Sequence, residues 1–270
     1  LLLAEDPTGT PGAEGALVLA FIPVGFEPKH VKALCAVGET TKGKREGYIG
    51  EKGIGFKSVF VVSSRPHIFS AGYRFRFQEE PDAEAQLGHI VPYWVSERHA
   101  MIQEYAGKTC ILLPLKRGKW EQVAGELDAI APETILFLSK LEGLTIQVGQ
   151  QKPIEVIRDD SRAPLIQFLK GDQYVEFWVL HQELPVPADL QEEKRESIST
   201  RRVSVALPLS ERFAIDKEVF AFLPTEVHSG FPFLINADFI LEISREAIQV
   251  DRPWNVWLRG SLPSVFALAF

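Results

Sequence analysis

The residues best suited to chemistry form a glycine-rich stretch, GYIGEKGIGFKSVF, at positions 47–60. It places four glycines and two lysines directly before an apolar run. Glycine lets the backbone approach a ligand closely, and the free amides at the start of a helix attract negative charge. The stretch therefore predicts a phosphate-binding site.

Three phosphate-binding designs compete for this stretch, and each demands its own spacing. A P-loop needs a lysine directly after its last glycine, but Phe56 stands before Lys57. A dinucleotide fingerprint needs a third glycine where Ser58 stands, and a strand before it. The third design is a mobile glycine-rich segment that closes over a triphosphate and runs into a helix from about Phe56, with Val59 and Phe60 in the core. A glycine turn that merely caps a helix is the alternative.

Hydrophobic periodicity predicts the elements that must hold this stretch. The apolar run GALVLAF at 15–21 is typical of a buried strand. A helix is predicted to begin at Pro28, because Val31, Leu34 and Cys35 then share one face. The other predicted elements are a hairpin over 67–77 around Ala71-Gly72, a strand over 107–115, a helix carrying Trp120, Val123 and Leu127, a helix over 133–141 and a strand over 144–148.

The character of the sequence changes near residue 149. From about 150 onward, segments such as YVEFWVL and RRVSVALPL predict a mainly antiparallel sheet, and a helix is predicted within 254–270. The charged, proline-bearing segment 181–202 is predicted to be a long loop between strands. We therefore predict a first domain over 1–148 and a second over 149–270.

Composition and charge narrow the class of protein. With 270 residues, 46% of them hydrophobic, the chain can bury a substantial core. No apolar run approaches the roughly 18 residues that span a bilayer, and the N-terminus lacks the basic flank of a signal peptide. We expect cytoplasmic or nuclear residence and no membrane partner. A net charge of −7 argues against nucleic acid as a partner.

Metal and hydrolase chemistry find little support in the sequence. Cys35 and Cys110 lie far apart without metal-binding companions, so we interpret them as buried structural thiols. The six histidines show no metal-ligand spacing, and no serine stands in a GxSxG motif. We expect no metal site built by these residues.

Four ordered segments resemble one known family. IGEKGIGFKSVF resembles the glycine box of the GHKL ATPases, the superfamily of heat-shock-protein-90 chaperones, gyrase, MutL and histidine kinases, and is most similar to their sacsin and NO VEIN branch. ALCAVGETTKG (33–43) resembles that branch's lid, GKTCILLPL (107–115) resembles the strand that supports the adenine pocket, and 222–246 resembles its second domain. The resemblance covers about 15–270. It implies an α+β protein in which a Bergerat-type α/β sandwich, a mixed sheet with helices on one face, precedes a second α+β domain with a mainly antiparallel sheet.

The resemblance also implies roles for individual residues. The nucleotide-binding positions are Gly50, Lys52, Gly53, Ile54, Gly55, Phe56, Lys57, Ser58 and Thr109, and the lid carries Thr40, Thr41 and Lys42. Arg245, in a Ser-Arg-Glu segment, would present its guanidinium to the terminal phosphate as a phosphate sensor. Solvent exposure is the alternative for the two lysines, and a salt bridge is the alternative for Arg245.

Two departures from the family pattern bear on hydrolysis and on adenine binding. The superfamily's first helix carries a glutamate as general base and an asparagine that holds magnesium, and nothing upstream of Gly15 matches this ExxxN pattern. The chain is expected to begin after that helix. Phe21 stands where the family has an aspartate that accepts from the adenine amine, and Pro23 replaces a glycine. Loss of one buried polar partner typically costs about 1–3 kcal/mol, and ordinary strand core is the alternative role for Phe21.

The function that the resemblance implies is therefore ATP binding by a chaperone-like module, with client or partner proteins. Mg²⁺ is expected for the family, although its ligand is not found in this chain. The ancestry is that of an ATPase, and hydrolysis is expected to be weak or deficient. The alternative is a pseudo-ATPase scaffold that binds protein without a nucleotide, through surface aromatics around Trp254 and Trp257; both tryptophans also fit the core of the second domain.

Overall fold

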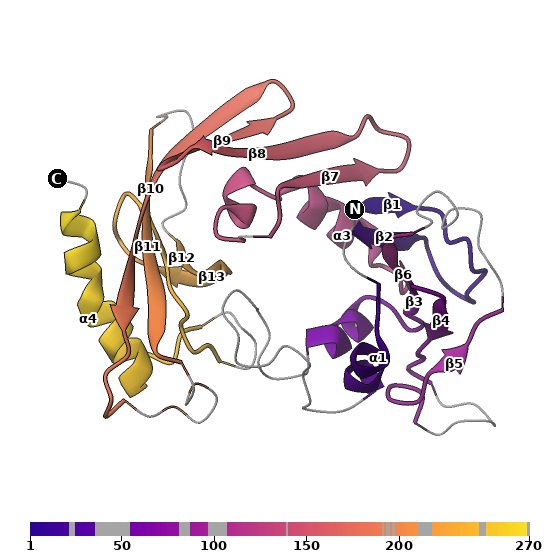
Figure 1. Ribbon diagram of the computed structural model, residues 1–270. Helices are drawn as coiled ribbons and strands as arrows, with labels where there is room; N and C mark the ends of the chain where they lie inside the picture. The colour runs from indigo at the N-terminus through magenta and orange to yellow at the C-terminus, as the bar shows by residue number, and fades with distance from the viewer. Residues whose placement is uncertain are drawn as a thin grey trace. The chain divides into compact units, whose positions relative to one another are not determined.

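The protein is a mixed α+β chain with few helices and a large, mostly antiparallel set of strands. The computed structural model describes residues 1–21, 25–35, 55–80, 87–96, 107–138, 140–190, 192, 195, 198–209, 218–242 and 247–268. These divide into two compact units (Figure 1). The first holds the described residues up to Ile130 together with Thr145–Ile154, and the second holds Ala131–Leu144 and the described residues from Glu155 onward. The domain boundary near 149 stays a prediction.

The first unit is built on a sheet with the strand order β7-β1-β2-β6-β3-β4-β5. Only β1 and β7 run parallel among these neighbours, and the other pairs are antiparallel. The predicted strands at 15–21, 107–115 and 144–148 are confirmed, as is the hairpin at 67–77. The strands are β1 Leu2–Ala4, β2 Ala16–Phe21, β3 His67–Ser70, β4 Tyr73–Arg76, β5 Tyr93–Trp94, β6 Thr109–Pro114 and β7 Gly143–Val148.

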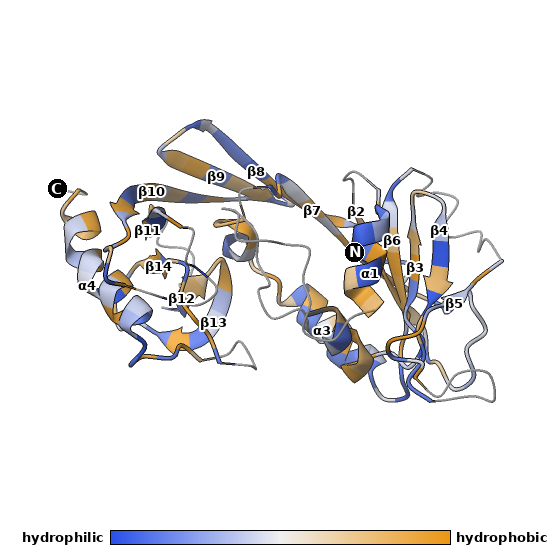
Figure 2. Ribbon diagram, turned by 60° about the horizontal axis from the view of Figure 1, so that its bottom comes forward, coloured by the Kyte–Doolittle hydropathy of each residue, from blue (hydrophilic) through white to orange (hydrophobic). Residues whose placement is uncertain are grey.

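The short helices of the first unit follow the predicted positions. Helix α1 (Pro28–Cys35) begins at its proline, whose missing amide costs nothing in a first turn. The predicted helix from Phe56 is present as a 3₁₀ helix, η1 (Gly55–Val61), with Phe60 buried. Helix α3 (Trp120–Asp128) buries Val123 and Leu127, and Figure 2 shows it alternating between hydrophilic and hydrophobic segments.

One face of the first sheet carries α1 and η1. Phe60, Ile68, Phe75 and Phe77 form a buried cluster there, and partly buried side chains of both helices pack against it. The opposite face buries a separate cluster that includes Val18. Strand β3 contributes to both clusters, Ile68 to the first and Phe69 to the second, because side chains alternate across a strand.

The second unit places α4 against β10 and β11 (Figure 1). Its strand order is β13-β12-β14-β11-β10-β9-β8, and only β12 and β14 pair in parallel. Trp254 and Leu258 of α4 are buried in the largest cluster of this unit. The elements are η2 Pro132–Ile135, β8 Ile154–Arg162, β9 Leu165–Lys170, β10 Gln173–Pro185, β11 Thr200–Pro208, β12 Glu218–Ala221, β13 Leu223–His228, β14 Leu234–Asn236 and α4 Pro253–Ala267.

Two sequence predictions for this unit are wrong. The helix expected over 133–141 is only the 3₁₀ turn η2, whose apolar residues pack into a tertiary cluster without a regular helix. The loop expected over 181–202 is shorter, because β10 continues to Pro185 and β11 begins at Thr200. Glu183 and Arg202 form an ion pair on the exposed side of these paired strands, while Leu184 and Val203 are buried.

No helix in the described part of the chain is long and apolar enough to cross a membrane.

Candidate functional site

Thr109, the predicted adenine-side residue, lies at the start of β6 and is fully buried. Its Oγ1 shares a 2.7 Å hydrogen bond with Oγ of Ser70, at the end of β3. The Phe26 amide, just before α1, donates to the same Ser70 Oγ at 2.8 Å. These two hydroxyls therefore tie the segment that follows β2 to the centre of the sheet.

The approach of that segment to the sheet depends on a glycine. A Cβ placed on Gly25 would lie 2.3 Å from the Cβ of Ala71, which is far inside van der Waals contact. Ala71 and Gly72 form the turn of the β3–β4 hairpin and have φ values of 47° and 90°. Paired positive φ values are typical of the tightest hairpin turns. Gly25 is thus needed for close backbone packing between the segment that precedes α1 and this turn.

Phe21, at the degenerate adenine position, ends β2 directly opposite Thr109. Directly opposite residues of an antiparallel pair lie on one face of a sheet. Although Thr109 is buried, the Phe21 side chain is 39% exposed. The strand-core alternative therefore fits Phe21 poorly, since an aromatic ring in a core would be covered.

Lys57 is held by main-chain oxygens. Its Nζ donates to the Leu34 carbonyl at 2.8 Å and to the His89 carbonyl, and lies 4.5 Å from the centroid of the Phe77 ring. Burial lowers the pKa of Lys57, while the nearby Cys35 thiol raises it. Leu34 is in the last turn of α1, where a cation also interacts favourably with the helix dipole. Lys57 therefore fastens η1 to the end of α1, and its ammonium points at protein oxygens.

The other described residues of the glycine stretch have distinct surroundings. Gly55 begins η1, and the Phe56 ring packs 5.6 Å from the Phe77 ring between centroids. Ser58 is exposed. The remaining predicted residues lie outside the part of the chain that the structure describes: Gly50, Lys52, Gly53 and Ile54 of the glycine box, Thr40, Thr41 and Lys42 of the lid, and Arg245.

The two cysteines differ in their surroundings. Cys110 is buried on β6, as predicted, and burial raises the pKa of its thiol. Cys35 is only partly buried at the end of α1, and burial raises its pKa against the opposing effect of Lys57. A raised pKa keeps both thiols protonated at neutral pH, which does not favour a nucleophile.

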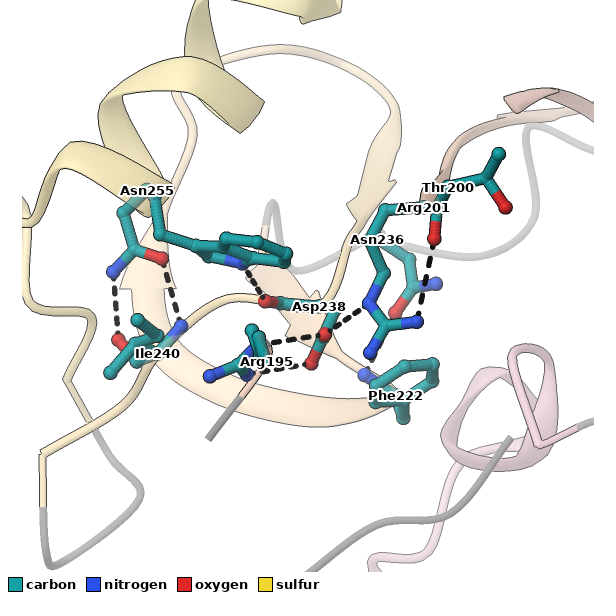
Figure 3. A network of polar contacts seen from close by, with 9 residues as sticks. Arg195, Thr200, Arg201, Phe222, Asn236, Asp238, Ile240 and Asn255 are labelled. Atoms are coloured by element: carbon teal, nitrogen blue, oxygen red, sulfur yellow. Dashed lines mark hydrogen bonds and ion pairs between the residues drawn. The ribbon is translucent and has the colours of Figure 1, made fainter. Parts of the chain in front are cut away.

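A buried polar network in the second unit holds residues on both sides of the Ser-Arg-Glu segment at 244–246 (Figure 3). Arg195 makes a paired contact with the Asp238 carboxylate at 2.9 and 3.0 Å, and Arg201 approaches the same carboxylate at 2.6 Å. The Trp254 indole donates to the Asp238 carbonyl at 2.9 Å. Asp238 is thus fixed through its side chain and its backbone.

Asn255 completes this network. Its side chain accepts from the Ile240 amide and donates to the carbonyls of Ile240 and Gln249, each at 2.8 Å. Because Ile240 and Gln249 lie on either side of the Ser-Arg-Glu segment, one buried amide holds both flanks of that segment against the first turn of α4. Sequence reasoning missed these residues, since a lone Asn or Asp carries no motif.

A magnesium ion finds no carboxylate site among the described residues. No group of three or more His, Cys, Asp or Glu side chains in the described ranges lies close enough to hold a metal ion.

The chain was compared with known proteins. No family model matches it. Protein NO VEIN of Arabidopsis thaliana is 32% identical to it over 267 residues, a match that covers 90% of this chain and 10% of NO VEIN. The chain is therefore homologous to a segment of NO VEIN and spans about a tenth of that relative's length.

Proposed function

We propose that the first unit is an ATP-binding module of the GHKL type found in the sacsin and NO VEIN branch, with a Bergerat-type sandwich, and that the second unit is its middle-like domain. One observation carries the proposal most directly. Thr109 and Phe21, from the adenine end, share a sheet face with Ile68, and the cluster around Ile68 also takes in Phe56 of the glycine box. Sequence-distant parts of one expected site thus meet on one face.

In this proposal the chain binds and orients a nucleotide but hydrolyses it weakly or not at all. Backbone amides of the glycine stretch would bind the phosphates, because glycines let the backbone approach a ligand closely and the free amides at the start of a helix attract an anion. The proposal includes a chaperone-like role toward client proteins. It assigns this chain no general base and no magnesium ligand.

The proposal is tested by changing the glycine box and measuring nucleotide affinity. Gly53→Val should weaken ATP binding at least tenfold in calorimetry, because a branched side chain blocks backbone approach to phosphate. Gly125→Val is the control, since Gly125 lies on α3 with open space around its Cβ position. Unchanged ATP affinity in a folded Gly53→Val variant would remove the glycine box from the site.

A nucleotide-independent scaffold is the second candidate, and two observations favour it. Thr109 is buried and bonded to Ser70, and the Lys57 ammonium is bonded to carbonyl oxygens. Neither presents a polar group to a ligand in this arrangement. The surface proposed for partner binding loses support, however, because Trp254 is only 1% exposed and packs against the partly buried Trp257.

A further inference from the structure

Four residues on neighbouring strands form a row across the first sheet. Phe21 on β2 is opposite Thr109 on β6, Thr109 bonds to Ser70 on β3, and Ser70 is opposite Tyr73 on β4. Ser70 lies two residues after Ile68, so the row is on the face that carries α1 and η1. This is the face on which the proposed nucleotide site is built.

The two hydroxyls nearest to Phe21 in this row, those of Thr109 and Ser70, form hydrogen bonds within the protein. Ser70 is 4% exposed and Thr109 is 0% exposed, and they bond to each other. Ser70 Oγ also accepts a hydrogen bond from the Phe26 amide, on the segment between β2 and α1. A base lying over the row would therefore find these polar groups already bonded and covered.

Phe21 differs from its neighbours in this row. It is 39% exposed, and its ring has faces for stacking but no group that donates or accepts at a base edge. Tyr73, which carries a phenol, lies three strand spacings from β2, or roughly 14 Å. Its ring stacks with Trp94. Of the four side chains in the row, Phe21 is the one that can meet a base at the end of β2.

We infer that this site recognises a nucleotide base by stacking on the exposed ring of Phe21 and not by hydrogen bonds to the base edge. The site then takes adenine and guanine nucleoside triphosphates without separating them, because both bases have faces that can stack. This inference rests on the proposed nucleotide-binding function and adds to it the class of ligand. Phe21 is its specificity-determining residue.

The test is a calorimetric comparison of ATP and GTP binding to the 270-residue chain and to single variants. ATP and GTP should bind the unaltered chain with affinities within about threefold of each other. Phe21→Leu should weaken both about tenfold, because it removes the aromatic face on which the base stacks, and Phe21→Tyr should retain both. Phe231→Leu is the matched control, since Phe231 is an exposed aromatic of the second unit.

A further variant should create the selectivity that the chain lacks. Phe21→Asp supplies a carboxylate that accepts from the adenine amine and repels the guanine carbonyl, so ATP should exceed GTP by about tenfold. Strong ATP preference in the unaltered chain, or unchanged binding in a folded Phe21→Leu variant, would overturn the inference while leaving nucleotide binding intact. Binding of neither nucleotide would overturn the proposed function and the inference together.

Discussion

Ser70 joins parts of the first unit that are far apart in the sequence. It accepts the Phe26 amide before α1 and bonds to Thr109 on β6, and both hydroxyls are buried. A buried polar group without a partner costs about 1–3 kcal/mol, whereas a typical satisfied hydrogen bond contributes about 0.5–1.5 kcal/mol to stability. Ser70 therefore stabilises the segment between β2 and α1. Its position in the sequence gives no sign of this role.

The two hydroxyls should contribute unequally to stability. Ser70→Ala removes the acceptor of one amide and the partner of one hydroxyl, and should lower the free energy of unfolding by about 2 kcal/mol. Thr109→Val removes only one bond, and should cost about 1 kcal/mol. Denaturant unfolding of both single variants and the double variant measures this. Strict additivity would show that the two side chains do not interact.

Lys57 is predicted to stabilise the fold through the carbonyls of Leu34 and His89. Lys57→Met should lower the free energy of unfolding by about 1 kcal/mol, a value reduced for partial exposure. Lys152→Met, at an exposed lysine, should change it little. If Lys57→Met instead leaves stability unchanged and weakens ATP binding, the ammonium belongs to the ligand and not to the end of α1.

At the scale of elements, the end of β2 and the β3–β4 turn must fit together. Gly25→Ala should destabilise the first unit, because the new methyl group would overlap the Ala71 methyl group. Ala71→Gly should restore much of that loss, since the next atom, the Ala71 Cα, would be 3.2 Å away. Thermal unfolding of the two single variants and the double variant provides the measurement. Absence of rescue would mean that the new methyl group is excluded by the backbone atoms of residue 71 and not by the Ala71 methyl group.

Helix η2 gives a pH-dependent prediction. Burial raises the pKa of Glu133 above its ordinary value of 4.5, against opposing effects of a backbone hydrogen bond and Lys170. A raised pKa in the folded state means that this residue's contribution is full below pH 4.5 and is lost as the pH rises through the folded value.

The Glu133→Gln variant removes that titration. Its stability relative to the unaltered chain should therefore increase from pH 4.5 to pH 7.5, as measured by denaturant unfolding at both values. Glu121→Gln, at an exposed position of α3, is the matched control. A difference that stays constant with pH would show that Glu133 is not desolvated.

The sequence predicted those elements whose signals are local. Strand β2 and helix α1 follow from an apolar run and a proline start, and the hairpin follows from Ala71-Gly72 between alternating residues. The prediction of a helix over 133–141 was wrong because the apolar residues there pack into a tertiary cluster without a regular helix. The predicted loop over 181–202 was too long because charged residues such as Glu183 and Arg202, on the exposed side of paired strands, were interpreted as part of a loop. Ser70 and Asn255 were missed because their bonds join residues distant in sequence.

At the scale of the whole molecule, the chain joins two units, each with its own hydrophobic core. The chain spans about a tenth of the length of NO VEIN. Within this segment, the first unit brings together the described parts of the predicted nucleotide site. The second unit holds both flanks of the Ser-Arg-Glu segment through Asn255.

The most direct test of the central claim is equilibrium binding of ATP and ADP to the 270-residue chain by calorimetry, with and without magnesium. We predict micromolar binding that is indifferent to magnesium, because the ExxxN pattern whose asparagine holds the ion in the resembling family has no match in this chain. Absence of binding up to millimolar ATP would contradict the proposed nucleotide site and favour the nucleotide-independent scaffold.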